Sequence, residues 1–204
     1  LNAASKLAFV ASEEQCAETN TRIREEALRS CPSDISRANL ISSMRAYIRR
    51  VLGDFEVFEG LIPSLIKVTP GATESRSRIH SLPQLKLTLR PYISSKASDQ
   101  IRSLYRSFGF DKVRPRVCDT NRIELVPKDW RKNRTIACEP EGNLAFQLAF
   151  DTWAKRRLRR FGIDLTDQSA NQRLARLGST SGLYATVDFS SASDTIAYNT
   201  VAWI

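Results

Sequence analysis

A region rich in proline and glycine interrupts the helical pattern of this chain and most limits the folds open to it. Within residues 60–98 the breaks fall at Pro63, Pro70, Gly71, Pro83 and Pro91. Because proline lacks a backbone donor and disfavours helix in the residue before it, we expect short strands and loops here. Helical patterns lie on both sides, without the regular rhythm of a parallel sheet. The sequence therefore predicts an α+β fold.

Helices are predicted where apolar residues recur every three or four positions. Across residues 33–53, Ile41, Met44 and Ile48 form one apolar stripe, with Ser33 as a cap and Gly53 as a stop. The same reasoning predicts helices over 99–110, 143–161 and 167–178, ending near Gly109, Gly162 and Gly178, the last one capped by Asp167.

The composition excludes several classes of protein. The chain has 204 residues and 42% hydrophobic content, enough for one sizeable core or two small ones, and no apolar run approaches the roughly 20 residues that span a bilayer. We therefore expect no membrane association. His80 is the single histidine, and the four cysteines contain no CxxC pair, so zinc sites and His-dependent triads are poorly supported. The scattered cysteines favour a reducing, interior compartment.

The charge indicates a phosphate-bearing partner. The net charge is +9, and arginine outnumbers lysine 23 to 8. Arginine forms planar, bidentate contacts with phosphate, which favours a nucleic acid or nucleotide partner. A solvated basic surface is the alternative. Residues 112–134 are especially basic, with eight cationic and three acidic side chains, and we expect this stretch to be extended.

The segment VPKDWRKNRTIACEP, residues 126–140, concentrates cations in a predicted turn. Four of them could line a channel for phosphates, or hold an RNA backbone while Trp130 stacks on a base. These four are Lys128, Arg131, Lys132 and Arg134. The alternative is a solvated hairpin anchored in the core by Trp130. Glu139 is interpreted as a salt-bridge partner rather than a catalytic acid.

A second candidate site lies where an apolar run ends in an acid. Leu183–Val187 is predicted as a strand that ends at Asp188, and Asp194 follows after a serine-rich segment. In one extended strand the two acids would be roughly 20 Å apart, so we expect a break and a helix beginning near Ser193. One carboxylate at a strand end suits Mg²⁺ bound with substrate phosphates. A helix-capping aspartate is the alternative.

Three strings in order resemble one known family. VPKDWRKNRTIACEPEGN, RRFGIDLTDQSANQRLARLGS and ATVDFSSASDTI are similar to segments of the RNA-dependent RNA polymerase of leviviruses, the replicase β subunit of positive-strand RNA bacteriophages. The likeness is specific over about residues 122–204. Residues 1–121 match only by position.

The resemblance implies a right-hand polymerase fold. Residues 1–121 would be the N-terminal and fingers region, 122–181 the fingers with a nucleotide-guiding loop, and 182–204 the start of the palm with its motif A. Asp188 would be the catalytic aspartate and a ligand of Mg²⁺ in a two-metal site, and Asp194 would help to select the ribose 2′-hydroxyl. The cations at 128, 131, 132 and 134 would guide the incoming triphosphate.

The resemblance also implies partners and a missing part. RNA template and product, nucleoside triphosphates, host elongation factors Tu and Ts and a ribosomal protein are the expected partners, in the cytoplasm of the bacterial host. The Gly-Asp-Asp motif that completes the family's metal site does not occur in the sequence, so we expect a fragment that is inactive alone. The alternatives are a non-catalytic basic RNA-binding module, which would not explain Asp188, and a structural helical protein with a basic face.

Overall fold

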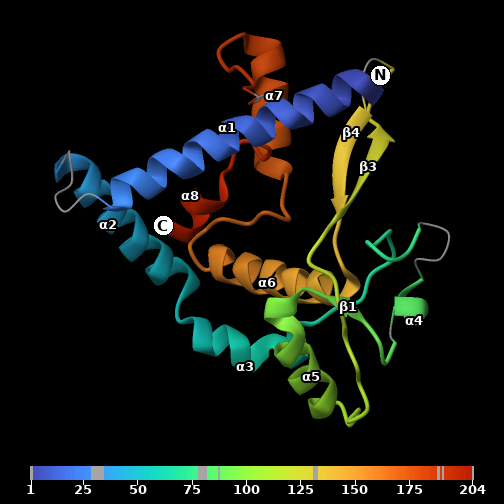
Figure 1. Cartoon of the computed structure of the whole chain (residues 1–204). Helices are drawn as coiled ribbons and strands as arrows, with labels where there is room; N and C mark the ends of the chain where they lie inside the picture. The colour runs from blue at the N-terminus through green and yellow to red at the C-terminus, as the bar shows by residue number, and fades with distance from the viewer. Residues whose placement is uncertain are drawn as a thin grey trace. The chain divides into compact units, whose positions relative to one another are not determined.

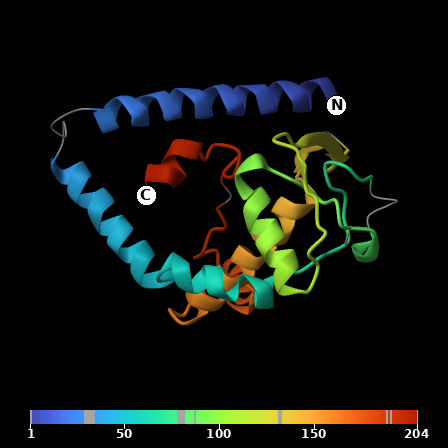
Figure 2. The ribbon, with the colours of Figure 1, turned by 60° about the horizontal axis from the view of Figure 1, so that its bottom comes forward.

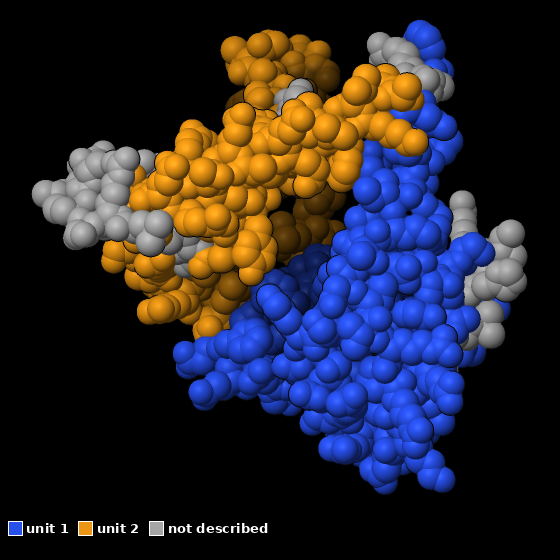
Figure 3. All heavy atoms as spheres, viewed as in Figure 1, with its two compact units in different colours: residues 1–2, 54–156 blue, residues 3–53, 157–204 orange. Residues whose placement is uncertain are grey.

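The computed structural model describes residues 2–28, 35–77, 82–86, 88–130, 133–187, 189 and 191–203. The chain forms two compact units, one of residues 1–2 and 54–156 and the other of residues 3–53 and 157–204 (Figure 3). Ser33, His80, Arg131, Lys132 and Asp188 lie outside the described residues.

Both helices and short strands are present (Figure 1). The helices are α1 (Asn2–Leu28), α2 (Ile35–Leu52), α3 (Phe55–Leu65), α4 (Pro83–Lys86), α5 (Ser98–Ser107), α6 (Glu141–Arg159), α7 (Ser169–Ser181) and α8 (Tyr198–Trp203), with a 3-10 turn over Ser95–Ala97. The strands are β1 (Tyr92–Ile93), β2 (Arg116–Val117), β3 (Arg122–Pro127) and β4 (Asn133–Cys138). β1 and β2 pair in parallel, and β3 and β4 pair antiparallel. The described helices include none with the length and apolar character of a membrane span.

Several predicted helix ends are confirmed. Gly53, Gly109 and Gly162 follow α2, α5 and α6 with φ of +76°, +82° and +79°, a left-handed conformation that glycine adopts without a steric penalty. Two expectations are wrong. α3 continues through Pro63 to Leu65 instead of breaking there, and α7 continues through Gly178 to Ser181. The αL residue that ends α7 is Gly182, at φ +67°.

The first unit is built on two adjoining clusters that involve α6. Phe58 of α3 packs edge-on against Phe150 of α6, with 5.6 Å between the ring centroids. It also packs against the tilted ring of Trp153, with 5.0 Å between the centroids. The second cluster is Ile93, Ile101 and Leu104, all buried, with Ile62, Ile66, Ala97, Tyr105 and Phe146 packed around it. Figure 2 shows α3, α5 and α6 gathered together as these contacts require. Burial of these large side chains, each stabilising by about 1.5–3 kcal/mol, holds the unit together.

In the second unit, polar contacts join segments far apart in sequence. The guanidinium of Arg157 donates from Nε to the carbonyl of Val51 at 2.9 Å, which satisfies an otherwise unpaired carbonyl at the end of α2. Near the other end of the chain, the backbone amide of Asn199 donates to Oδ1 of Asn20 at 2.8 Å, and its side-chain amide donates to the Asn20 carbonyl at 2.9 Å. These two bonds tie α8 to α1.

Candidate functional site

The basic segment of the sequence forms the antiparallel hairpin of β3 and β4 (Figure 1). Its register pairs Val126 with Arg134, Glu124 with Ile136 and Arg122 with Cys138. Directly paired residues of an antiparallel ladder share a face, and every second residue returns to it. Arg122 and Arg134 therefore lie on one face at opposite ends of the hairpin, Arg122 at its base and Arg134 near its tip.

At the base, Arg122 fastens the hairpin to the loop at residues 73–76. Its Nε donates to the carbonyl of Glu74 at 2.9 Å, and its Nη2 donates to the carbonyls of Thr73 at 2.8 Å and Arg76 at 3.2 Å. Its Nη1 pairs with the carboxylate of Glu124. A guanidinium presents five donors in a rigid plane, so one side chain can hold several carbonyls at once. Arg122 is thus committed to structure.

Buried polar groups lie at the start of α6, next to this loop. The carboxylate of Glu141 accepts a hydrogen bond from the Ser75 hydroxyl at 2.7 Å, and the Lys86 ammonium donates to the carbonyl of Thr69 at 2.7 Å. Burial lowers the pKa of Lys86, an effect that the nearby Glu141 opposes and Arg76 reinforces. Burial likewise raises the pKa of the Cys138 thiol, with a further contribution from Glu124. The loop at residues 73–76 is therefore held by Arg122 on one side and by Glu141, through Ser75, on the other.

The tip of the hairpin is solvated. Lys128, directly after β3, and Arg134, on β4, are both exposed. Trp130 is 84% exposed, so the predicted role of this indole as a core anchor is wrong. Arg131 and Lys132, the other two predicted cations, lie outside the described residues. A fixed base and exposed cations together suit charge-assisted hydrogen bonds to phosphate oxygens.

The second predicted site has a different local structure from the one expected. Residues 183–187 form no strand, and Leu183 and Val187 are 82% and 76% exposed. No described strand pairs with this segment, and an extended chain without a partner leaves its amides and carbonyls to water. The predicted strand is therefore wrong for the described residues. The predicted helix near Ser193 is also wrong, because turns occupy 191–195 and α8 begins at Tyr198.

The side chain of Asp194 is exposed, and its carboxylate and its backbone carbonyl each accept one hydrogen bond. Its Oδ1 accepts a hydrogen bond from the Ser193 hydroxyl at 3.2 Å, and its carbonyl accepts one from the Cys16 thiol of α1 at 3.3 Å. Asp194 belongs to the second unit and Arg134 to the first. Asp188, the predicted metal ligand, is outside the described residues.

The described residues do not form a metal site by themselves. Among them, no three histidine, cysteine, aspartate or glutamate side chains gather closely enough to hold an ion. Glu139, which the sequence suggested as an ion-pair partner, accepts a hydrogen bond from the Asn121 side chain at 2.9 Å. The carboxylates of this part of the chain therefore do not fit a complete Mg²⁺ site.

Sequence reasoning missed the structural roles of Arg122 and Glu141. Arg122 was one more cation of a basic stretch, and Glu141 one more acid at the start of a helix. Their partners at residues 73–76 lie 46 to 66 positions away in the chain. No local pattern marks such contacts.

Comparison with known proteins decides the family. A family described as RNA replicase, beta-chain, matches residues 1–203. The chain belongs to this family. Among relatives of this replicase chain, the RNA-directed RNA polymerase subunit beta of Escherichia virus Qbeta is 34% identical over 189 residues, which is 93% of this chain and 32% of that protein. The same subunit of Enterobacteria phage SP is 35% identical over 95% of this chain and 34% of that protein.

A third relative matches a shorter part. The RNA-directed RNA polymerase beta chain of Escherichia phage MS2 is 47% identical over 77 residues, or 38% of this chain and 14% of that protein. The replicase chain therefore spans about a third of the length of the Qbeta and SP relatives.

Proposed function

We propose that this chain supplies the fingers region and the beginning of the palm of an RNA-directed RNA polymerase that copies a phage RNA genome. Residues 1–121 would be the N-terminal and fingers region, and residues 122–181 the fingers with the nucleotide-guiding loop. Residues 182–204 would be the start of the palm. The observation that carries the proposal is the β3–β4 hairpin, with Arg122 committed to its base and Arg134 exposed near its tip. Membership of the replicase β-chain family supports it.

The cations at the hairpin tip would bind the incoming nucleoside triphosphate. Arg134 has the clearest role because β4 holds its backbone in a ladder while its side chain is exposed. Lys128 would add a second charge, and Arg131 and Lys132 complete the set that the resemblance implies. Charged donors positioned on a triphosphate stabilise both its binding and its charge during transfer. Asp194 would recognise the ribose 2′-hydroxyl.

Asp188 would supply one oxygen ligand to Mg²⁺. Polymerases of this kind would use the metal to assist attack by an RNA 3′-hydroxyl on the triphosphate. Because the described residues hold no complete ligand set, the remaining carboxylates would come from outside this chain. We therefore expect the chain alone to be inactive.

The expected partners follow from the same proposal. RNA template, RNA product and nucleoside triphosphates would be the substrates and product. Host elongation factors Tu and Ts and a ribosomal protein would assemble with the complete protein in the bacterial cytoplasm.

The decisive experiment is Asp188→Asn in the complete polymerase. Asparagine keeps the size and much of the hydrogen bonding of aspartate and caps helices about as well. We expect RNA extension to fall by several orders of magnitude, while thermal stability and RNA affinity hardly change, because a negative ligand is removed from the metal. Asp111→Asn, at an exposed acid of the first unit, is the matched control and should extend RNA normally. Near-normal extension by Asp188→Asn would refute the metal role.

A non-catalytic RNA-binding module is the second candidate. The exposed Trp130, two residues after Lys128, favours it, because an exposed indole can stack on an unpaired base. Magnesium separates the two candidates. Nucleotide binding by the complete protein that does not change when Mg²⁺ is removed would favour the binding module.

A further inference from the structure

A second basic surface lies on the parallel ladder of the first unit. Residues 112–118 run alongside residues 89–93, with the amides of Arg114, Arg116 and Cys118 donating to the carbonyls of Leu89, Pro91 and Ile93 at 2.8, 2.9 and 2.9 Å. β1 and β2 are the central part of this ladder, where Tyr92 is paired with Arg116. Residues 114–118 are therefore held in an extended conformation, and Lys112 lies in the turn that directly precedes them.

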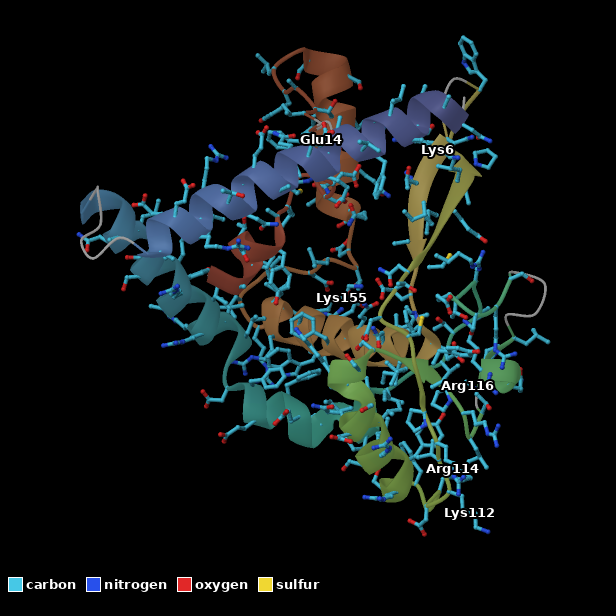
Figure 4. All side chains as sticks on the ribbon, viewed as in Figure 1. Lys6, Glu14, Lys112, Arg114, Arg116 and Lys155 are labelled. Carbon is cyan, nitrogen blue, oxygen red and sulfur yellow. The ribbon has the colours of Figure 1, made fainter. Side chains whose placement is uncertain are left out.

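The two faces of this ladder differ in character, although Val117, which pairs with Ile93, is 61% exposed at its end. Pro91, Ile93 and Val113 are buried and face the core. The alternate residues Lys112, Arg114 and Arg116 are all exposed. We call these three side chains, with Tyr92, the cationic face. Figure 4 shows the three labelled cations one after another along the segment, near the C-terminal end of α5 and away from the tip of the β3–β4 hairpin.

Arg116 and Tyr92 form a flat, ordered pair within this face. The guanidinium lies over the tyrosine ring at 5.5 Å from its centroid, and Nη1 donates to the Tyr92 hydroxyl at 3.0 Å. Holding the guanidinium in place lowers the entropy lost when it contacts a ligand. It also places a planar cation beside an aromatic ring, a combination on which unpaired bases stack.

The acids at the two ends of the segment do not neutralise the cationic face. Asp119 accepts hydrogen bonds from the backbone amide of Ser95 at 2.7 Å and from its hydroxyl at 3.0 Å. Asp111 is exposed in the turn before the extended residues and forms no ion pair with Lys112 or Arg114 among the described residues. Within the described parts of the chain, Lys112 and Arg114 form no ion pair. Their charges thus face solvent without compensation.

We propose that the cationic face binds the sugar-phosphate backbone of single-stranded RNA. Arg114 and Arg116 at alternate positions of a fixed extended segment, with Lys112 in the turn just before it, can follow an extended polyanion. The Arg116–Tyr92 pair offers a stacking surface that does not depend on base identity. This surface is separate from the hairpin tip to which the triphosphate role is assigned. It would guide RNA rather than select or join nucleotides.

The test is RNA binding by the whole 204-residue chain and its Lys112→Gln/Arg114→Gln variant. The probe is a short fluorescent oligouridylate, and its anisotropy is measured at several salt concentrations. We expect affinity to fall about tenfold, and the slope of log affinity against log salt to fall by about 1.4, since each phosphate contact to a single strand contributes about 0.7. Circular dichroism and thermal melting confirm that both proteins are folded.

The matched control is Arg173→Gln/Arg176→Gln, which removes the same charge from exposed positions of α7 in the second unit. We expect it to keep most of the parent's affinity and salt slope. Equal losses in the two variants would overturn the proposal, because net charge alone would then explain binding. Unchanged affinity in Lys112→Gln/Arg114→Gln would also overturn it, and would favour an acidic protein as the partner of this face.

Two further measurements sharpen the result. Arg116→Lys keeps the charge but removes the planar group, so we expect a smaller, salt-independent loss of affinity. The second measurement repeats the binding of Lys112→Gln/Arg114→Gln with a duplex RNA of the same length. If affinity fell for the duplex but not for the single strand, the single-strand assignment would be refuted. The outcome is also independent of the polymerase proposal, because Asp188→Asn tests extension with RNA affinity intact, whereas this variant tests affinity without extension.

Discussion

The carbonyl oxygen of Tyr184 lies 2.7 Å from the point that a Cβ atom would occupy on Gly178. The chain leaves α7 at Gly182, whose amide donates to the Gly178 carbonyl at 2.9 Å, and then passes close to the last turn of the helix. Gly178 therefore allows a close backbone approach, while Gly182 ends the helix. This contact fixes the direction in which residues 183–187 leave α7, immediately before Asp188.

Gly178→Ala should destabilise the chain. A Cβ closer than 3 Å to a backbone carbonyl forces the backbone to shift, and such overpacking costs about 1–3 kcal/mol, more than the roughly 1 kcal/mol that alanine gains over glycine in a helix. We expect the free energy of unfolding in urea to fall by up to about 2 kcal/mol. Gly60→Ala in α3 is the control, because nothing lies within 4 Å of its Cβ position, and it should stabilise by about 0.5–1 kcal/mol. Equal behaviour of the two variants would contradict the close contact.

Arg122→Lys should loosen the base of the hairpin. Lysine keeps the charge but cannot reach the carbonyls of Thr73, Glu74 and Arg76 together, so partly buried acceptors lose their donors. We expect unfolding free energy to fall by about 1–3 kcal/mol. Arg134→Lys, at the exposed end of the same face, should change it by less than about 0.5 kcal/mol. An Arg122→Lys protein with the parent's urea midpoint would show that the bonds to residues 73–76 contribute nothing.

Asp164 should titrate at unusually low pH. Hydrogen bonds from the hydroxyl and the backbone amide of Thr166, with further help from Arg159, lower the pKa of its carboxyl to about 2 from 3.8. Because the folded pKa is below the unfolded one, the stabilising contribution is complete above about pH 3.8 and is lost as pH falls toward 2. Carboxyl NMR across this range measures the pKa directly.

Thr166→Val supplies the control for this titration. Valine cannot donate the hydroxyl hydrogen bond of 2.6 Å to Oδ1 of Asp164 but leaves the backbone donor in place. The pKa of Asp164 should therefore rise partway toward its ordinary value. A pKa that stays the same would assign the shift to the backbone amide of Thr166 and to Arg159 instead of the hydroxyl.

Arg134→Ala in the complete polymerase should impair nucleotide use more than RNA binding. Loss of one charge-assisted phosphate contact costs about 1.5–3 kcal/mol, which corresponds to roughly ten- to a hundredfold in the KM for nucleotide. Arg102→Ala removes an exposed cation paired with Asp99 on α5 and should leave this KM near the parent's value. If RNA affinity fell while the nucleotide KM stayed constant, the triphosphate role of Arg134 would be wrong.

Part of the candidate site could be predicted because its signals are local. Pro127, Asp129 and the clustered cations of 126–140 indicated a basic turn, and the structure shows a hairpin there with Lys128 and Arg134 exposed. Nothing local distinguished Arg122, which is bonded to a distant loop, from Arg134, which faces solvent. The same limitation led to the incorrect strand over 183–187, because a short apolar run forms a strand only if a partner strand is present.

The sequence by itself determined the family, the positions of α2, α5, α6 and α7 and the ends of α2, α5 and α6. These follow from residue chemistry that acts over a few positions, such as apolar spacing and the freedom of Gly53, Gly109 and Gly162 to adopt positive φ. Tertiary structure alone decided that Gly178 is a packing residue and that Lys112, Arg114 and Arg116 form one exposed face over a buried Val113. The physical reason is that a side chain's role depends on the backbone placed next to it, and here that backbone comes from residues 6 to 49 positions away.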